Sequence, residues 1–253
     1  MSKTALITGA TAGIGLATAE LFAQNGWNLI ITGRRKDRLD SVLVEYEKDI
    51  SIHRINFDVR DLEGVNSCVK YIEDNGILVD LLVNNAGLAL GLESFDEANI
   101  NDWETMIDTN IKGLLYMSRA LSRHMIEHGI PGHLIHVGSL AGHEVYPRGH
   151  VYCSTKHAVK ALARGMRMDL YEHGIRVGSV DPGMVETEFS QVRFHGDSEK
   201  AEKVYKGFQP LEAIDVADVI YFMATRPAHV NIDDVLMMCS DQASSVHVNR
   251  RNG

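Results

Sequence analysis

Tyr152 and Lys156 lie four residues apart in the segment V-Y-C-S-T-K, and Ser139 precedes them in V-G-S-L-A-G. Four residues are about one helical turn, so on a helix the two side chains would share a face. A phenol with an unperturbed pKa of about 10 is a poor acid–base catalyst at neutral pH, but a nearby ammonium favours its ionised form. The pair therefore indicates a tyrosine tuned for proton transfer to or from an alcohol or carbonyl oxygen, which Ser139 could hold. Because such pairs are also common on exposed helices, this interpretation depends on the rest of the chain.

A glycine-rich turn follows the first predicted strand. An apolar run occupies residues 3–8, G-A-T-A-G-I-G occupies 9–15, and a helical pattern then extends to Asn25. Glycine allows close backbone approach and a helix N-terminus attracts an anion, so this order predicts a phosphate cradle. The spacing is G-x-x-x-G-x-G rather than the commoner G-x-G-x-x-G. The alternative is a glycine-rich turn that binds no ligand.

Six motifs, taken in order, resemble those of the short-chain dehydrogenase/reductase family. They are T-G-A-T-A-G-I-G (8–15), N-N-A-G (84–87), Asn110 in D-T-N-I-K-G, Ser139, the Tyr152–Lys156 pair, and D-P-G (181–183). The resemblance covers residues 3–238, nearly the whole chain. It implies a single-domain Rossmann fold over residues 1–253, oxidoreductase activity, and a catalytic tetrad of Asn110, Ser139, Tyr152 and Lys156.

The resemblance also implies a role for each site residue. Tyr152 would donate the proton to a carbonyl in reduction and accept it in oxidation, while Lys156 would lower the Tyr152 pKa and bind the nicotinamide ribose. Asn110 would anchor a water chain that leads to Lys156. The implied cofactor-binding residues are Gly9, Thr11, Ala12, Gly13, Ile14, Gly15, Arg34, Arg35, Asp58, Val59, Asn85, Ala86, Gly87, Tyr152, Lys156, Pro182, Gly183, Val185 and Thr187.

The end of the second predicted strand indicates the choice of cofactor. The adenosine ribose of a dinucleotide lies near this point, where an acidic residue would bind the 2′-hydroxyl of NAD. This chain instead has Thr32-Gly33-Arg34-Arg35. Guanidinium groups offer planar, bidentate donors suited to a phosphate, so we predict NADP(H). The alternative is that both arginines lie in solvent.

Alternating strand and helix patterns predict a doubly wound, parallel α/β sheet of about seven strands with helices on both faces. The predicted strands are 4–8, 28–32, 51–57, 79–84, 132–138, 175–181 and 234–238, and the predicted helices are 13–25, 36–48, 61–75, 102–128, 150–173 and 215–225. The long polar segment 184–212 interrupts the alternation and is predicted to be a substrate lid. The C-terminal tail, 240–253, could reach a neighbouring subunit's site.

Composition favours one soluble enzyme domain. The chain has 253 residues, of which 45% are hydrophobic, and a net charge of −9, which argues against nucleic acid or an anionic membrane as partner. No apolar run could span a bilayer and no signal-peptide pattern is present. The three widely spaced cysteines (Cys68, Cys153 and Cys239) suggest free thiols in a reducing compartment, so we expect a cytoplasmic protein.

The substrate is predicted from further resemblance to a subgroup of the family that acts on small 3-hydroxy acids, with relatives that reduce sulfoacetaldehyde. Because such substrates are anionic, the site needs a cation, and Arg148 and Arg193 are the candidates beside Ser139 and Tyr152. A reductase of bulkier neutral ketones and a non-catalytic NADP-binding regulator are the alternatives.

Two further expectations concern metals and assembly. His124 and His128 have a spacing that metal ligands can adopt on a helix, but no third ligand is evident nearby, so we expect no metal site. The resemblance implies a homotetramer assembled through the helix that carries Tyr152 and through the final strand.

Overall fold

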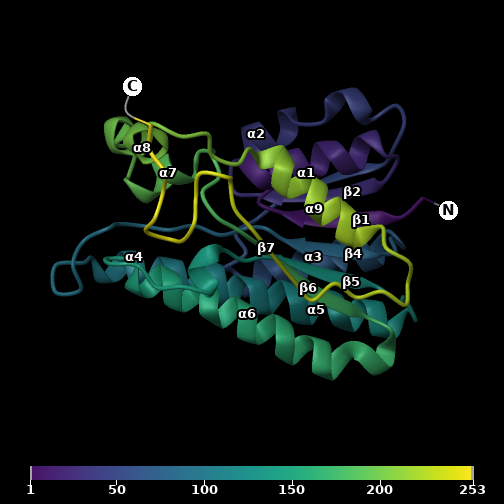
Figure 1. The fold of residues 1–253 in the computed structure, drawn as a ribbon. Helices are drawn as coiled ribbons and strands as arrows, with labels where there is room; N and C mark the ends of the chain where they lie inside the picture. The colour runs from purple at the N-terminus through teal and green to yellow at the C-terminus, as the bar shows by residue number, and fades with distance from the viewer. Residues whose placement is uncertain (1, 252–253) are drawn as a thin grey trace.

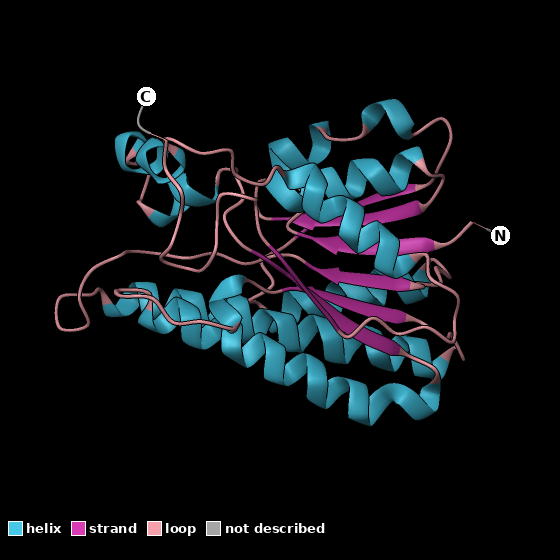
Figure 2. Cartoon of the chain, in the orientation of Figure 1, coloured by secondary structure: helices cyan, strands magenta, loops and turns pink. Residues whose placement is uncertain are grey.

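The computed structural model describes residues 2–251. A seven-stranded parallel sheet lies between two layers of helices (Figures 1 and 2). The strand order is β3-β2-β1-β4-β5-β6-β7, which confirms the predicted doubly wound sheet. Every residue of β1, β4 and β5 is buried, as expected for central strands covered on both faces. The strands are β1 Thr4–Thr8, β2 Asn28–Gly33, β3 Ile52–Asn56, β4 Leu81–Asn84, β5 His133–Val137, β6 Arg176–Pro182 and β7 Asp234–Met237.

Each face of the sheet has its own hydrophobic core. Helices α1, α2 and α9 pack on one face, where Phe22 and Ile220 are buried, and α3, α5 and α6 pack on the other, around Ile72 and Leu121 (Figure 1). The α-helices are α1 Gly13–Gln24, α2 Lys36–Ser41, α3 Leu62–Asp74, α4 Ile100–Ile107, α5 Leu114–Glu127, α6 His150–Leu170, α7 Phe189–Arg193, α8 Ser198–Tyr205 and α9 Ala213–Ala224. A π-helix, Asp108–Gly113, and short 3₁₀ turns at Val44–Tyr46, Leu140–Gly142 and Tyr171–His173 complete the helical elements.

Three predicted segments differ from the structure. The helix expected at 36–48 ends at Ser41, because Val42 is extended and Leu43 has a left-handed φ of 62°. The helix expected at 102–128 contains the π-helix 108–113, and such insertions often mark functional sites. The segment 184–212 is not a continuous loop. It holds α7 and α8, and Asp197 caps α8 by accepting a hydrogen bond from the Lys200 N–H.

The strand order reverses between β1 and β4, and in this fold ligands bind at such a switch point, beyond the carboxyl ends of the strands. Figure 2 shows the strand arrows pointing toward the part of the molecule where α7, α8 and the C-terminal tail lie. The architecture therefore places the lid directly over the region where the predicted site residues converge.

The C-terminal tail lies over the cavity of its own chain. The sequence left open a reach to a neighbouring subunit's site, and within its own chain Arg250 donates hydrogen bonds to the carbonyls of Val204 (2.9 Å) and Lys206 (2.6 Å), at the end of α8. The Arg251 N–H donates to the Gly207 carbonyl. These contacts join the tail to the lid, because the carbonyls at the C-terminus of α8 need donors from outside the helix.

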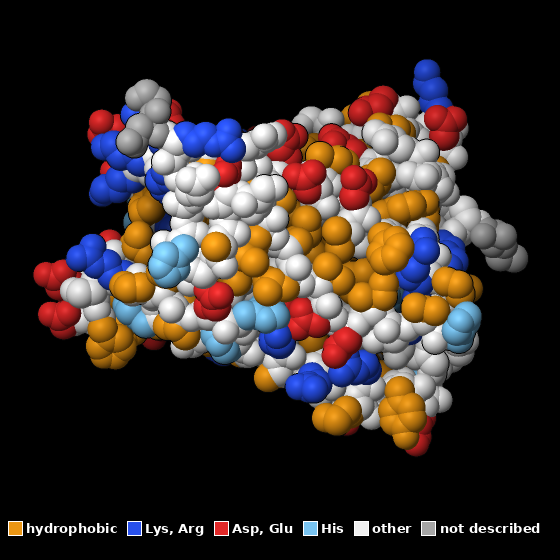
Figure 3. Space-filling view, in the orientation of Figure 1, with side chains coloured by type: hydrophobic (Ala, Val, Ile, Leu, Met, Phe, Trp, Pro, Cys, Tyr) orange, Lys and Arg blue, Asp and Glu red, His pale blue; other side chains and the backbone are white. Residues whose placement is uncertain are grey.

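Apolar side chains gather on one outer face of the molecule, over α9 and β7 (Figure 3). The exposed large apolar residues of these two elements are Ile214, Phe222 and Leu236. Within residues 2–251 we find no helix that combines the length and the hydrophobicity needed to traverse a bilayer.

Candidate active site

A cavity of about 740 Å³ lies at the carboxyl edge of the sheet, enclosed by the glycine-rich turn, the end of β5, α6, the lid and the tail. Such a volume suits a small-molecule or cofactor site. The predicted site residues that line it are Gly9, Thr11, Ala12, Gly13, Ile14, Arg34, Arg35, Asp58, Val59, Asn85, Ala86, Gly87, Ser139, Tyr152, Lys156, Pro182, Gly183, Val185, Thr187 and Arg193. Segments far apart in the sequence thus converge on one cavity.

The glycine-rich turn has the geometry of an anion cradle. Gly9 and Gly13 have left-handed φ angles of 68° and 54°, which glycine adopts without a steric penalty. A side chain on Gly15 would overlap the Gly9 carbonyl and the Asn85 amide, so the turn requires glycine there. Ala12 provides no side-chain cap for α1, and no acidic residue lies in its first turn. The first N–H groups of α1 are therefore left for an anionic ligand such as a diphosphate.

The tetrad residues meet at the inner end of the cavity. Tyr152 is 8% exposed, and Ser139 lies close enough to lower the pKa of its phenol. The Lys156 Nζ atom donates to the Val137 carbonyl at 2.9 Å and lies 5.9 Å from the centroid of the Tyr152 ring. Asn110, in the π-helix, lies just behind the wall, where its amide pairs with the backbone of Leu88 (2.8 and 2.9 Å) and contacts the Thr155 hydroxyl. Asn110 therefore fixes the loop after β4 against α6.

Burial controls the ionisation of the two central groups. It raises the pKa of Tyr152 above its usual value, with the neighbouring Tyr146 adding to the shift and Arg193 and Ser139 opposing it. Burial likewise lowers the pKa of Lys156 to about 8, although the negative charge of Asp181 acts to raise it. We expected Lys156 to lower the Tyr152 pKa, but desolvation is the larger influence in this structure. The Tyr152 phenol is therefore neutral near neutral pH.

The arginine pair predicted from the sequence lines the cavity beside the glycine-rich turn. Arg35 donates to the Thr11 hydroxyl at 3.0 Å and pairs with Glu188 at 2.7 Å, and Glu188 also pairs with Arg38 at 2.6 Å. Arg34 lies 3.7 Å from Asp58. Sequence reasoning missed Glu188, because an acidic residue at the start of the lid carries no signal of an ion pair 150 residues away.

Arg193 lies against Tyr152 in the wall of the cavity. Its guanidinium carbon is 5.1 Å from the Tyr152 ring centroid and 5.6 Å from that of Phe189, and it donates a hydrogen bond to the Tyr146 hydroxyl. No acidic side chain among residues 2–251 pairs with it, and its buried Nε has no partner there. An unneutralised, half-buried cation beside the proton donor is suited to bind an anion.

Arg148 is not part of the cavity. It lies in the turn before α6, is exposed, and has a left-handed φ of 66°. The four-residue spacing to Tyr152 would place both side chains on one helical face only if the helix included residue 148, but α6 begins at His150. The structure therefore favours Arg193 over Arg148. The sequence did not single out Tyr146 and Phe189, which position the Arg193 guanidinium.

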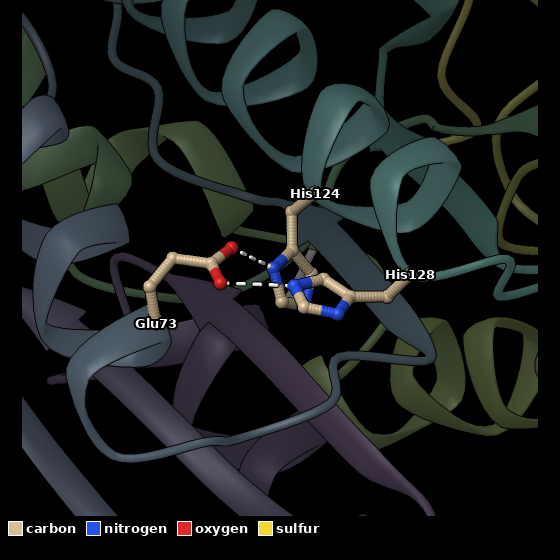
Figure 4. A group of neighbouring side chains, drawn as sticks. All are labelled: Glu73, His124 and His128. Carbon is tan, nitrogen blue, oxygen red and sulfur yellow. Dashed lines mark hydrogen bonds and ion pairs between the residues drawn. The ribbon is translucent and has the colours of Figure 1, made fainter.

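His124 and His128 lie away from the cavity and share a third polar partner that the sequence did not reveal. Glu73 on α3 accepts from His124 (2.5 Å) and His128 (2.9 Å) on α5 (Figure 4). The Val79 N–H donates to the His124 Nε2, so the ring proton lies on Nδ1, the atom that faces Glu73. That nitrogen has no lone pair for a metal, and the group is a hydrogen-bonded clamp between α3 and α5.

Comparisons with known proteins show the family of the chain. The family model for short chain dehydrogenase matches residues 3–198. A sulfoacetaldehyde reductase of Chromohalobacter salexigens is 43% identical over 245 residues, or 97% of each chain. An NADP-dependent 3-hydroxy acid dehydrogenase of Salmonella typhi is 44% identical over 234 residues, which are 92% of this chain and 93% of that protein. The closed form of serine dehydrogenase complexed with NADP+ matches with a TM-score of 0.90 at 41% identity, over 99% of this chain and all of that chain.

The glycine cradle, the convergent tetrad and these similarities lead to one conclusion: the chain belongs to the short-chain dehydrogenase family.

Proposed function

We propose that this protein, an NADP(H)-dependent oxidoreductase, interconverts a small 3-hydroxy acid and the corresponding oxo acid or semialdehyde. The observation that carries the proposal is the unneutralised guanidinium of Arg193, 5.1 Å from the ring centroid of Tyr152. A carboxylate held by Arg193 would place an adjacent carbonyl next to the phenol. The bidentate geometry of guanidinium–carboxylate pairs would also orient the substrate.

The names of the relatives support an anionic substrate. They refer to serine, to 3-hydroxy acids and to sulfoacetaldehyde, each of which carries a carboxylate or a sulfonate close to the reacting carbon. Because a guanidinium also accepts a sulfonate, reduction of sulfoacetaldehyde or another small aldehyde is the second candidate.

The chemistry proposed for the chain's own residues is proton transfer and orientation. The bound nicotinamide supplies or accepts the hydride. In reduction, the Tyr152 hydroxyl donates its proton to the carbonyl oxygen, which Ser139 holds by a hydrogen bond. The Lys156 ammonium then stabilises the phenolate that remains. Return of a proton to Tyr152 through Lys156, along a water chain that Asn110 anchors, is the remaining proposed step.

The other two functional readings have less support. A bulkier neutral ketone would leave the guanidinium of Arg193 without a partner, which is costly in a half-buried site. A non-catalytic regulator would have no use for a buried phenol and ammonium held on one helix face beside Ser139.

A substrate panel tests the proposed specificity. In initial-rate measurements of NADPH oxidation, we expect kcat/KM for malonic semialdehyde or sulfoacetaldehyde to exceed that for a neutral ketone of similar size by about 100-fold, the range expected for a hydrogen-bonded ion pair. Preference for the neutral ketone would discard the substrate class and leave the reaction type intact.

Substitution of Arg34 tests the basis of cofactor preference. We expect Arg34→Asp to reduce the ratio of kcat/KM for NADP over NAD by about 100-fold, because a guanidinium is lost and a repelling carboxylate is added near the 2′-phosphate. Lys36→Asp makes the same reversal of charge near the same turn, but Lys36 lies outside the cavity and pairs with Asp40, so this variant is the control. An unchanged ratio in Arg34→Asp would refute this role.

We propose a homotetramer as the assembly, and the exposed apolar side chains over α9 and β7 support one of its two interfaces, the one through the final strand (Figure 3). Contiguous apolar surface of this kind often marks a protein interface. Sedimentation equilibrium measures the assembly directly, and a monomer at micromolar concentration would contradict it.

A further inference from the structure

A buried acid lies beneath the active site. Asp181, near the end of β6, is 2% exposed, and a side chain on Gly138 would overlap its carboxylate. Lys156 approaches the same strand end, since its Nζ donates to the carbonyl of Val137. Asp181 and Lys156 thus contact two consecutive residues at the end of β5. The sequence motif D-P-G marked this position only as a turn.

Asp181 is held by a chain of polar side chains that leads to the surface. The His143 Nε2 lies 2.6 Å from the Asp181 carboxylate, and Lys160 lies 2.7 Å from Nδ1 of the same ring and 3.3 Å from Nε2. An ammonium can only donate, so Nδ1 is the acceptor and the ring proton lies on Nε2, which donates to Asp181. Lys160 also pairs with Asp234 at 2.8 Å. Every link in this chain therefore has a donor and an acceptor.

The cluster of His143, Asp181 and Asp234 has a composition that could bind a cation. The Lys160 ammonium already fills that role, because it is hydrogen-bonded to His143 and paired with Asp234. The group therefore serves another purpose in this structure.

Lys156 needs a counter-charge more than an exposed lysine does. It is 7% exposed, and burial favours its neutral form. Of the titratable groups around it, Tyr152 on α6 is neutral, and His136 on β5 is neutral because burial lowers its pKa to about 4. The remaining one, Asp181 on β6, raises the Lys156 pKa. Toward the loop after β4 it faces Gly87 and Asn110, which carry no charge.

We propose that Asp181 is the counter-charge that keeps Lys156 an ammonium, and that His143 and Lys160 are positioning residues that hold Asp181 as a carboxylate. The assignment rests on the proposed chemistry of Tyr152 and Lys156. Burial and the nearby Asp234 raise the pKa of Asp181, while the hydrogen bond from His143 lowers it. Without His143, Asp181 would gain a proton and Lys156 would lose its counter-charge.

Asp181→Asn tests the proposal through the pH profile. In reduction, Tyr152 must hold its proton and Lys156 must be charged, and the loss of one negative charge lowers both pKa values. We therefore expect the alkaline limb of kcat/KM to move about one pH unit lower, while the Kd for NADPH changes less than about threefold. His143→Leu should shift the limb in the same direction by a smaller amount, and His143→Gln, which retains a donor, should restore most of the difference.

An alkaline limb that stays in place in a folded, NADPH-binding Asp181→Asn protein would overturn the proposal. If that variant does not fold, an unshifted His143→Leu profile would do the same. The ionisation of Lys156 is also measurable by NMR of ¹⁵Nζ-labelled lysine, with Lys156→Met as the assignment control. A lower titration midpoint in Asp181→Asn would support the counter-charge even if the substrate proposal failed, so the two failures are distinguishable.

Discussion

Replacement of Tyr152 by phenylalanine is expected to reduce kcat in carbonyl reduction by about 1000-fold or more. General acid catalysis typically contributes a factor of about 10² to 10⁴, and Phe removes the proton while keeping the ring. The ring packs against Phe189 and Arg193, so the shape of the cavity should be retained. Single-turnover measurements with NADPH and the best substrate of the panel give the rate of the chemical step.

The binding of cofactor separates this effect from misfolding. We expect the Kd of NADPH for Tyr152→Phe, measured by fluorescence, to stay within about twofold of the wild-type value, since the diphosphate cradle is formed by the glycine-rich turn and the start of α1, which the substitution leaves unchanged. Retained turnover would refute the mechanism. Ser139 carries the only other hydroxyl of the tetrad, and it could not act as the proton donor without losing its substrate contact.

Replacement of Arg193 by methionine is expected to lower kcat/KM for an anionic substrate by about 100-fold or more. Removal of one partner of a buried, hydrogen-bonded charge pair costs about 2–5 kcal/mol, which is the origin of this estimate. The loss should be much smaller for a neutral carbonyl compound, because its transition state makes no ion pair. Arg193→Lys should recover only part of the loss, since an ammonium lacks the bidentate fork.

Arg148→Met is the matched control for this experiment, because Arg148 is exposed and lies outside the cavity. We expect its kcat/KM to remain within about twofold of wild type, as is usual for surface substitutions. Equal losses for anionic and neutral substrates in Arg193→Met would mean that Arg193 supports the Tyr152 ring and does not bind the anion.

The sequence predicts the sheet and most of the helices well, because buried parallel strands are short apolar runs and glycines follow several helices. All seven strands lie within two residues of their predicted ends. The helix expected at 36–48 was wrong in length, because the left-handed φ of Leu43 depends on contacts that no local pattern encodes. The two short helices of the lid were missed for the same reason.

The sequence predicts the parts of the site whose residues lie close together in the chain. It does not predict the parts whose interacting residues lie far apart in the chain. The glycine cradle and the Tyr152–Lys156 pair each lie within a few residues, so their spacing alone indicates geometry. The choice between Arg148 and Arg193 depended on where α6 begins and on aromatic rings from other segments. The chain from Asp181 to Lys160 joins three elements, and no spacing in the sequence connects them.

The attachment of the tail to the lid means that segments on both sides of the family-model boundary enclose one cavity. The family model ends at residue 198, where α8 begins, whereas Ser245, Val246 and Arg250 of the tail line the cavity mouth. Arg193 and α7 lie inside the matched residues, and the tail lies beyond them, yet both line the same cavity. An exchange meant to move a substrate preference between relatives would therefore have to carry the lid and the tail together, as residues 184–251.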